Sequence, residues 1–78
     1  MRKKYPGLDY VGRMIKTYRK INNLTQEELA EKTDLDNTYL SDLERGKCTI
    51  AAHHLIRIAK ALNIQVGDLF PDVRDVPI

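Results

Sequence analysis

Apolar residues recur at helical spacing along almost the whole chain, and this periodicity limits the fold more than any other feature of the sequence. The clearest case lies between residues 9 and 21, where apolar side chains keep the i, i+3, i+4, i+7 spacing of a helix with one buried face: Val11, Met14, Ile15 and Tyr18. No stretch shows the sustained alternation of a half-buried strand, and no Asn-Gly or Asp-Gly pair indicates a hairpin. The sequence therefore predicts an all-α fold.

Start and stop signals divide this pattern into five predicted helices. They cover residues 9–21, 26–33, 37–44, 51–62 and 66–70.

The second and third of these helices carry the clearest boundary signals. Thr25-Gln26-Glu27-Glu28 reads as a capping box, in which the Thr25 hydroxyl accepts from the Glu28 amide while the Glu28 carboxylate accepts from the Thr25 amide. Asp36 is the expected N-cap of the third helix. Gly46 is the expected left-handed residue after its end, and Asp34 is expected to take the same conformation after the second helix.

Length and composition narrow the class of protein. The chain has 78 residues, which corresponds to one domain. A single cysteine, Cys48, excludes an internal disulfide framework and favours a reducing compartment. The basic N-terminus is not followed by an apolar signal stretch, and no apolar run approaches the ~20 residues that cross a bilayer. We therefore expect a cytoplasmic protein without a membrane partner, with a basic arm over residues 1–8, a helical domain over 9–70 and a tail over 71–78.

The net charge of +2 conceals a strong segregation of charge along the chain. The net charge is +6 over residues 1–24, −6 over 25–44, +4 over 45–63 and −2 over 64–78. Separate basic blocks create local positive fields that a global count hides. These basic blocks are compatible with DNA or RNA as a binding partner, but they do not demonstrate such binding.

The predicted helices over 26–33 and 37–44 are short and are joined by a turn of three residues. A small residue, Ala30, stands where the two helices would cross, so they can approach closely. These features are typical of a helix-turn-helix. Short helix pairs also occur in other helical bundles, so the pattern alone favours DNA binding only modestly.

Specific runs of residues carry a resemblance to a known family. The runs Leu24-Thr25-Gln26-Glu27-Glu28-Leu29-Ala30 and Tyr39-Leu40-Ser41-Asp42-Leu43-Glu44-Arg45-Gly46-Lys47 closely resemble the Cro/repressor-type helix-turn-helix family, also called the Xre family. Ile58-Ala59-Lys60-Ala61-Leu62 and Asp68-Leu69-Phe70 look like the fourth and fifth helices of that family. The similarity covers about residues 11–70. Within the family, Leu35-Asp36-Asn37-Thr38-Tyr39-Leu40-Ser41 is most similar to controller proteins of restriction–modification systems.

The resemblance implies a compact five-helix fold of the lambda-repressor type whose third helix lies in the major groove. It also implies a homodimer that binds an inverted repeat in double-stranded DNA, a palindromic operator with half-sites about one helical turn apart. The implied function is sequence-specific transcriptional regulation, as a repressor or autoregulator.

The resemblance also assigns DNA-contacting roles to individual residues. Three positions correspond to those that read base edges: Asn37 suits adenine, Thr38 the methyl group of thymine, and Asp42 the amino group of cytosine. An acid close to phosphates is repelled unless it finds such a donor, so Asp42 is equally well explained as a solvated surface residue. The positions that would contact the phosphate backbone are Gln26, Tyr39, Arg45, Lys47, Thr49 and His53. Independently of the resemblance, free amides and the helix dipole favour an anion beside Gln26.

Two further assignments are structural. Arg19 and Glu44 match a pair that forms an internal ion pair between the first and third helices. Three apolar residues near the fifth helix match the region in which this family often dimerises: Leu69, Phe70 and Val73.

The sequence also departs from the family pattern at helix ends. Ala51 stands where a Ser or Thr usually caps the fourth helix, and Thr49 is a possible substitute cap that would shift the helix start. Asp34 and Asn63 replace expected glycines.

A metal site or an enzyme is a poor explanation of Cys48, His53 and His54. Three potential ligands are too few for a four-ligand structural zinc site, and adjacent helical histidines point about 100° apart. A Cys–His nucleophile would need an orienting third group and a pocket. We therefore expect no catalysis, no metal or other cofactor, and no small-molecule ligand.

A protein-interaction module, such as an antitoxin or adaptor on the same fold, is the alternative function. Apolar residues close to the C-terminus would supply its docking surface: Leu69, Phe70, Val73, Val76 and Ile78. A self-dimer should persist at micromolar concentration, whereas an adaptor would be monomeric or would aggregate.

Overall fold

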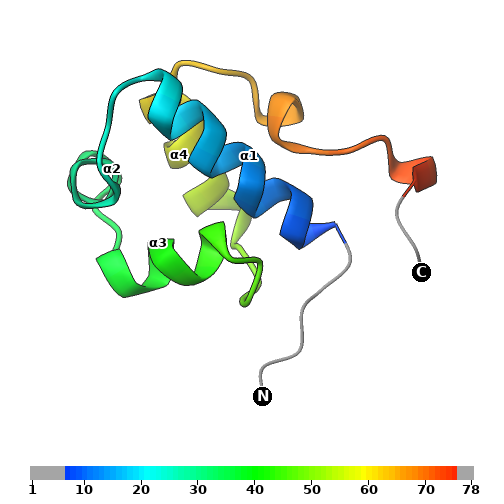
Figure 1. Cartoon of the computed structure of the whole chain (residues 1–78), viewed down its shortest axis with the longest axis horizontal. Coiled ribbons are helices and arrows are strands. Elements are labelled where there is room, and N and C mark those ends of the chain that lie inside the picture. The colour runs from blue at the N-terminus through cyan, green and yellow to red at the C-terminus, as the bar shows by residue number, and fades with distance from the viewer. Residues whose placement is uncertain (1–6, 76–78) are drawn as a thin grey trace.

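Four α-helices and two short 3-10 turns make up residues 7–75, the part of the chain that the computed structural model describes (Figure 1). The side chain of Val73 lies outside this description, as do Val76 and Ile78. The elements in chain order are α1 (Leu8–Ile21), α2 (Gln26–Thr33), α3 (Asn37–Glu44), α4 (Ala52–Leu62), η1 (Val66–Leu69) and η2 (Val73–Asp75). No strand occurs within residues 7–75, which agrees with the predicted all-α class.

The predicted fifth helix over residues 66–70 is wrong, because this segment forms the 3-10 turn η1. A segment this short cannot offset the cost of nucleating an α-helix. The ring of Pro71 also disfavours a helical conformation at Phe70, which is extended with φ −104° and ψ 146°.

The predicted boundaries of α2 and α3 are confirmed. Thr25 Oγ1 accepts from the Glu28 amide at 3.1 Å, and Glu28 Oε1 accepts from the Thr25 amide at 2.8 Å. Asp36 Oδ2 accepts from the amides of Thr38 and Tyr39 at 2.9 and 3.2 Å. These side chains satisfy amide groups that have no partner inside their helices.

Three helices are followed by a residue in the left-handed conformation. Asp34 and Asn63, which replace glycines of the family pattern, have φ of 56° and 57°, and Gly46 has φ of 70°. The start of α4 differs slightly from its prediction, since the helix begins at Ala52 with Ala51 as its N-cap. No side chain caps this helix, so Thr49 does not act as the substitute cap.

The core is built from every α-helix and from η1. Its completely buried side chains are Ile15, Leu29, Leu40, Ile58, Leu62 and Leu69. Helix α1 packs against α3 and η1, while α2 packs against both α3 and α4 (Figure 1). Ala30 is buried, as expected of a small residue at a helix crossing. Within residues 7–75, no helix is long and apolar enough to span a membrane.

The closest approach of α1 to α3 occurs at Gly12. A Cβ atom at this position would lie 2.2 Å from the Leu43 carbonyl oxygen and 2.8 Å from that of Glu44. Both neighbours are backbone atoms, so they cannot turn away as a flexible side chain could. Gly12 therefore allows α1 to lie directly against the C-terminal end of α3.

Candidate nucleic-acid interface

Helix α3 presents a polar face to solvent and an apolar face to the core. Leu40 and Leu43 are buried, whereas Asn37 and Thr38 are exposed in the first turn. Asp42 is half-buried and lies four residues after Thr38, which places the two residues on the same side of the helix. The three side chains that we predict to read base edges thus share the outward region of one helix.

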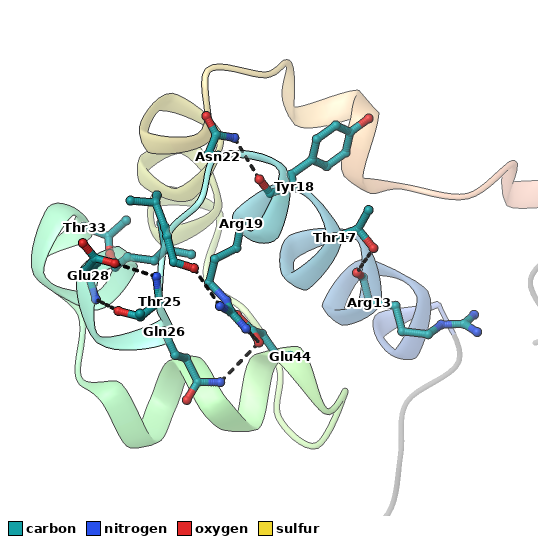
Figure 2. Close-up of polar contacts among 12 residues, drawn as sticks. Arg13, Thr17, Tyr18, Arg19, Asn22, Thr25, Gln26, Glu28, Thr33 and Glu44 are labelled. Carbon is teal, nitrogen blue, oxygen red and sulfur yellow. Dashed lines mark hydrogen bonds and ion pairs between the residues drawn. The ribbon is translucent and has the colours of Figure 1, made fainter.

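The C-terminal end of α3 is held by the predicted ion pair, which is confirmed (Figure 2). Arg19 Nε lies 2.8 Å from Glu44 Oε2, and Arg19 Nη2 lies 3.1 Å from Glu44 Oε1. A third Arg19 nitrogen, Nη1, donates to the Leu24 carbonyl at 2.8 Å. The Arg19 and Glu44 side chains are only 11% and 4% exposed, so α1 fixes α3 through a buried, bidentate contact.

Gln26, at the start of α2, points to the same carboxylate (Figure 2). Its Nε2 donates to Glu44 Oε1 at 3.2 Å, and its side chain is half-buried. A primary amide has two hydrogens, so this bond leaves one for an external acceptor. The contact with Glu44 therefore orients Gln26 without using its whole donor capacity.

A shallow hollow of about 210 Å³ adjoins Gln26. Its lining residues are Lys16, Arg19, Gln26, Ser41, Glu44 and Arg45. The Arg19 charge is neutralised by Glu44, whereas Lys16 and Arg45 are exposed and bring positive charge to the rim. Sequence reasoning missed Lys16. Its position three residues before Arg19 was the available signal, because that spacing puts both side chains on one face of α1.

Tyr39 joins α3 to the first turn of α4. Its Oη lies 3.0 Å from His54 Nδ1, and the two rings meet edge-on with centroids 5.2 Å apart. Partial burial raises the pKa of Tyr39, although a hydrogen bond from the Ala51 backbone opposes this shift. Partial burial also lowers the pKa of His54, and the neighbouring His53 and Arg57 lower it further. Tyr39, which we expected to contact phosphate, is therefore already paired within the chain.

The pairing of Tyr39 with His54 also escaped sequence reasoning, because helical spacing does not relate residues on two different helices. His53 and His54 have ring centroids 4.1 Å apart, which is closer than the divergent arrangement expected of adjacent helical histidines. Within residues 7–75, no group of three or more His, Cys, Asp or Glu residues could hold a metal ion.

The loop after α3 and the start of α4 carry the remaining predicted phosphate contacts. Arg45, Thr49 and His53 are exposed, and Lys47 is half-buried. The first turn of α4 contains no acid and no side-chain cap, so its positive dipole end faces outward without a carboxylate of its own. These features meet the electrostatic needs of an anion-binding surface, while the individual contacts stay predictions.

The predicted dimer residues have different surroundings. Leu69 is completely buried in the core of its own chain, so its proposed place in a dimer interface is wrong. Phe70 is 43% exposed and leaves part of its ring available. The side chain of Val73 lies outside the described structure.

Comparison with known proteins supports the resemblance seen in the sequence. A helix-turn-helix family model matches residues 15–69. Control protein C.SmaI of Serratia marcescens is 46% identical over 55 residues, which are 70% of this chain and 66% of that protein. The chain thus spans slightly less than two thirds of the length of that relative.

Solved structures agree with this similarity. The restriction–modification controller protein C.AhdI from Aeromonas hydrophila superposes with a TM-score of 0.78 and 32% identity, covering 81% of this chain and 96% of C.AhdI. The biofilm master regulator SinR, solved in complex with DNA, superposes with a TM-score of 0.72 and 33% identity, covering 76% of this chain and 95% of SinR. Because the family model also covers most of the chain, this protein belongs to the helix-turn-helix family of the Cro/repressor (Xre) type.

Proposed function

We propose that this protein is a sequence-specific DNA-binding transcriptional regulator that acts as a homodimer on an inverted repeat. The observation that carries this proposal is the outward polar face of α3, with Asn37, Thr38 and Asp42 on a helix held in place by buried contacts. A helix presented in this way has the dimensions to enter the major groove. The similarity to C.AhdI, a controller protein, and to SinR, solved with DNA, supports the same function.

The contacts around α3 separate into two classes. Asn37, Thr38 and Asp42 read base edges and supply specificity. One group of phosphate contacts is Gln26 with Lys16 and Arg45 around the hollow. The second group lies on α3, on the loop after it and at the start of α4: Tyr39, Lys47, Thr49 and His53. The protein acts in the cytoplasm through binding, without catalysing a reaction and without a cofactor.

Dimerisation explains how such a small domain gains specificity. One reading helix contacts only a few base pairs, whereas two related by twofold symmetry read a site of twice the length. Of the predicted interface residues, Phe70 is 43% exposed and contributes part of its ring to the interface. The concentration of the protein and its dimerisation set how much of the DNA site is occupied.

Selection of bound sequences from a randomised duplex pool tests this proposal. Enrichment of an inverted repeat with half-sites about 10 bp apart, centre to centre, is the expected result. Enrichment of a single half-site would retain sequence reading and overturn the dimer. Salt-sensitive binding without enrichment would overturn sequence-specific regulation and would direct attention to the alternative of a protein-interaction module.

Two substitutions separate base reading from phosphate contact. Thr38→Ala should change the preferred base at one position of the half-site, costing about 1–3 kcal/mol on the preferred sequence only. Lys47→Ala should weaken binding to all sequences alike and reduce the slope of log affinity against log salt by about one. Identical behaviour of the two variants in salt titrations on several duplexes would contradict the assignment.

A further inference from the structure

The hydrogen bond between Tyr39 and His54 has two possible polarities, and only one of them suits DNA. If His54 Nδ1 carries no proton, the Tyr39 hydroxyl donates to it, and the outward side of the phenol oxygen can only accept hydrogen bonds. If Nδ1 carries a proton, it donates to the Tyr39 oxygen, and the hydroxyl hydrogen becomes free for another acceptor. A phosphate oxygen accepts and never donates, so it can pair with Tyr39 only in the second state.

We propose that His54 is a positioning residue for DNA binding: through its hydrogen bond to Tyr39 it decides whether the Tyr39 hydroxyl meets a phosphate as a donor, and protonation of His54 favours the donating state. The inference rests on the proposed DNA-binding function. It adds a residue that no sequence pattern assigned, because Tyr39 and His54 lie on different helices.

The surroundings of the pair favour the unprotonated ring when no anion is present. The charged and titratable groups nearby are His53 and Arg57 on α4 and Cys48 in the preceding loop. Burial, His53 and Arg57 all lower the pKa of His54. Arg57 also donates to the Thr33 carbonyl at 3.3 Å, which ties it to the end of α2. Asp36, the acid that caps α3, engages the Tyr39 amide rather than the imidazole.

An approaching phosphate reverses this balance. Its negative charge beside the first turn of α4 stabilises an imidazolium there, and its need for a donor selects the state in which Nδ1 is protonated. DNA binding should therefore raise the pKa of His54 and take up a proton. By linkage, the affinity for DNA should increase as the pH falls.

The test uses the full chain and a fluorescently labelled duplex of about 30 bp and mixed sequence, since phosphate contacts carry no sequence information. Dissociation constants are measured at fixed salt between about pH 8 and pH 6, the range in which histidine titrates. His54→Asn keeps a hydrogen-bonding group near the Nδ1 position but does not titrate. His53→Asn removes the adjacent imidazole and keeps the Tyr39 and His54 side chains. Because His53 is itself a proposed phosphate contact, this variant should bind more weakly overall, so its affinity at each pH is compared only with its own affinity at the higher pH.

We expect the natural protein and His53→Asn to bind about three- to tenfold more tightly at the lower pH, which corresponds to a rise of about half to one unit in the His54 pKa on binding. His54→Asn should lose this gain. Tyr39→Phe should lose it as well, although His54 is still present, because the effect passes through the hydroxyl.

Other outcomes overturn the inference in distinguishable ways. Retention of the gain in His54→Asn would show that His54 is not its source. Loss in His54→Asn with retention in Tyr39→Phe would mean that the imidazole contacts phosphate directly, which overturns the positioning role. Failure of the natural protein to bind the duplex at any pH would instead overturn the proposed function. Circular dichroism of each variant at both pH values checks that the helical fold is unchanged.

Discussion

At its C-terminal end α3 is held by Glu44, which forms a buried bidentate ion pair with Arg19, and by backbone packed against Gly12. Near its N-terminal end α3 is held by Tyr39, whose half-buried side chain forms a hydrogen bond with His54. The first set of contacts combines a buried ion pair with backbone that cannot move aside. The second is the hydrogen bond whose direction, as we propose, changes when His54 gains a proton. The comparison teaches that one helix can be rigidly placed at one end and remain chemically responsive at the other.

The N-termini of α2 and α4, which both lie beside α3, also differ in how completely their own side chains satisfy them. The start of α2 is closed by its own capping box, and the hydrogen bonds from the Thr25 backbone and side chain lower the pKa of Glu28. The start of α4 has neither a side-chain cap nor an acid. Local contacts therefore complete the first terminus, whereas the second has no side-chain partner for its first amides.

The largest loss of stability should follow from removing the ion pair at the C-terminal end of α3. Glu44→Ala should lower the free energy of unfolding by about 3–5 kcal/mol, because it leaves the Arg19 guanidinium buried without its partner. The double variant Arg19→Met, Glu44→Leu should lose less, since no buried charge remains. Urea unfolding followed by circular dichroism measures both. A double variant as unstable as Glu44→Ala would show that packing, rather than the unpaired charge, sets the cost.

The second largest loss of stability is expected for Gly12→Ala. Its methyl group would overlap the Leu43 carbonyl oxygen, so α1 must move away from α3 at a cost of about 2–3 kcal/mol. Thermal unfolding measures this loss. Gly67→Ala is the matched control, because a Cβ atom there meets nothing within 4 Å. Equal losses in the two variants would contradict the importance of the close approach.

Asp36→Ala should have a smaller effect, confined to the N-terminal end of α3. It removes the acceptor of two amide hydrogen bonds and should cost about 1 kcal/mol. Amide hydrogen exchange should then increase for Thr38 and Tyr39 and stay unchanged around Glu44. A uniform increase along α3 would argue against the independence of the two ends.

The smallest effect concerns pH. Folding lowers the pKa of His54, so the unfolded chain binds more protons and stability falls as the pH decreases below about 6.5. His54→Asn should remove this part of the acid-induced loss in thermal melts recorded between about pH 8 and pH 5.5. Stability should thus decrease as the pH falls, whereas the affinity for DNA should increase. Equal pH dependence in the variant and the natural protein would assign the loss to other groups.

Much of the candidate interface was predictable because its signals are local or belong to a well-marked family pattern. The capping box of α2 and the Asp36 cap of α3 involve residues two or three positions apart, so they can be read directly. The Arg19–Glu44 pair spans 25 positions and came only through the resemblance. Gly12 and the Tyr39–His54 contact were missed, because their partners lie on other helices. Lys16 was missed although its spacing from Arg19 on α1 is a local signal.

The sequence by itself determined the helical class, the extents of α1 to α4 within one residue and the chemistry of the outward face of α3. Periodicity, caps and left-handed residues act over a few positions, so their effect does not depend on the rest of the chain. Only the tertiary structure decided which residues meet across helices. It placed Leu69 in the core instead of at a dimer interface, and it brought His54 to Tyr39. These outcomes depend on the space left between packed helices, which no short stretch of sequence encodes.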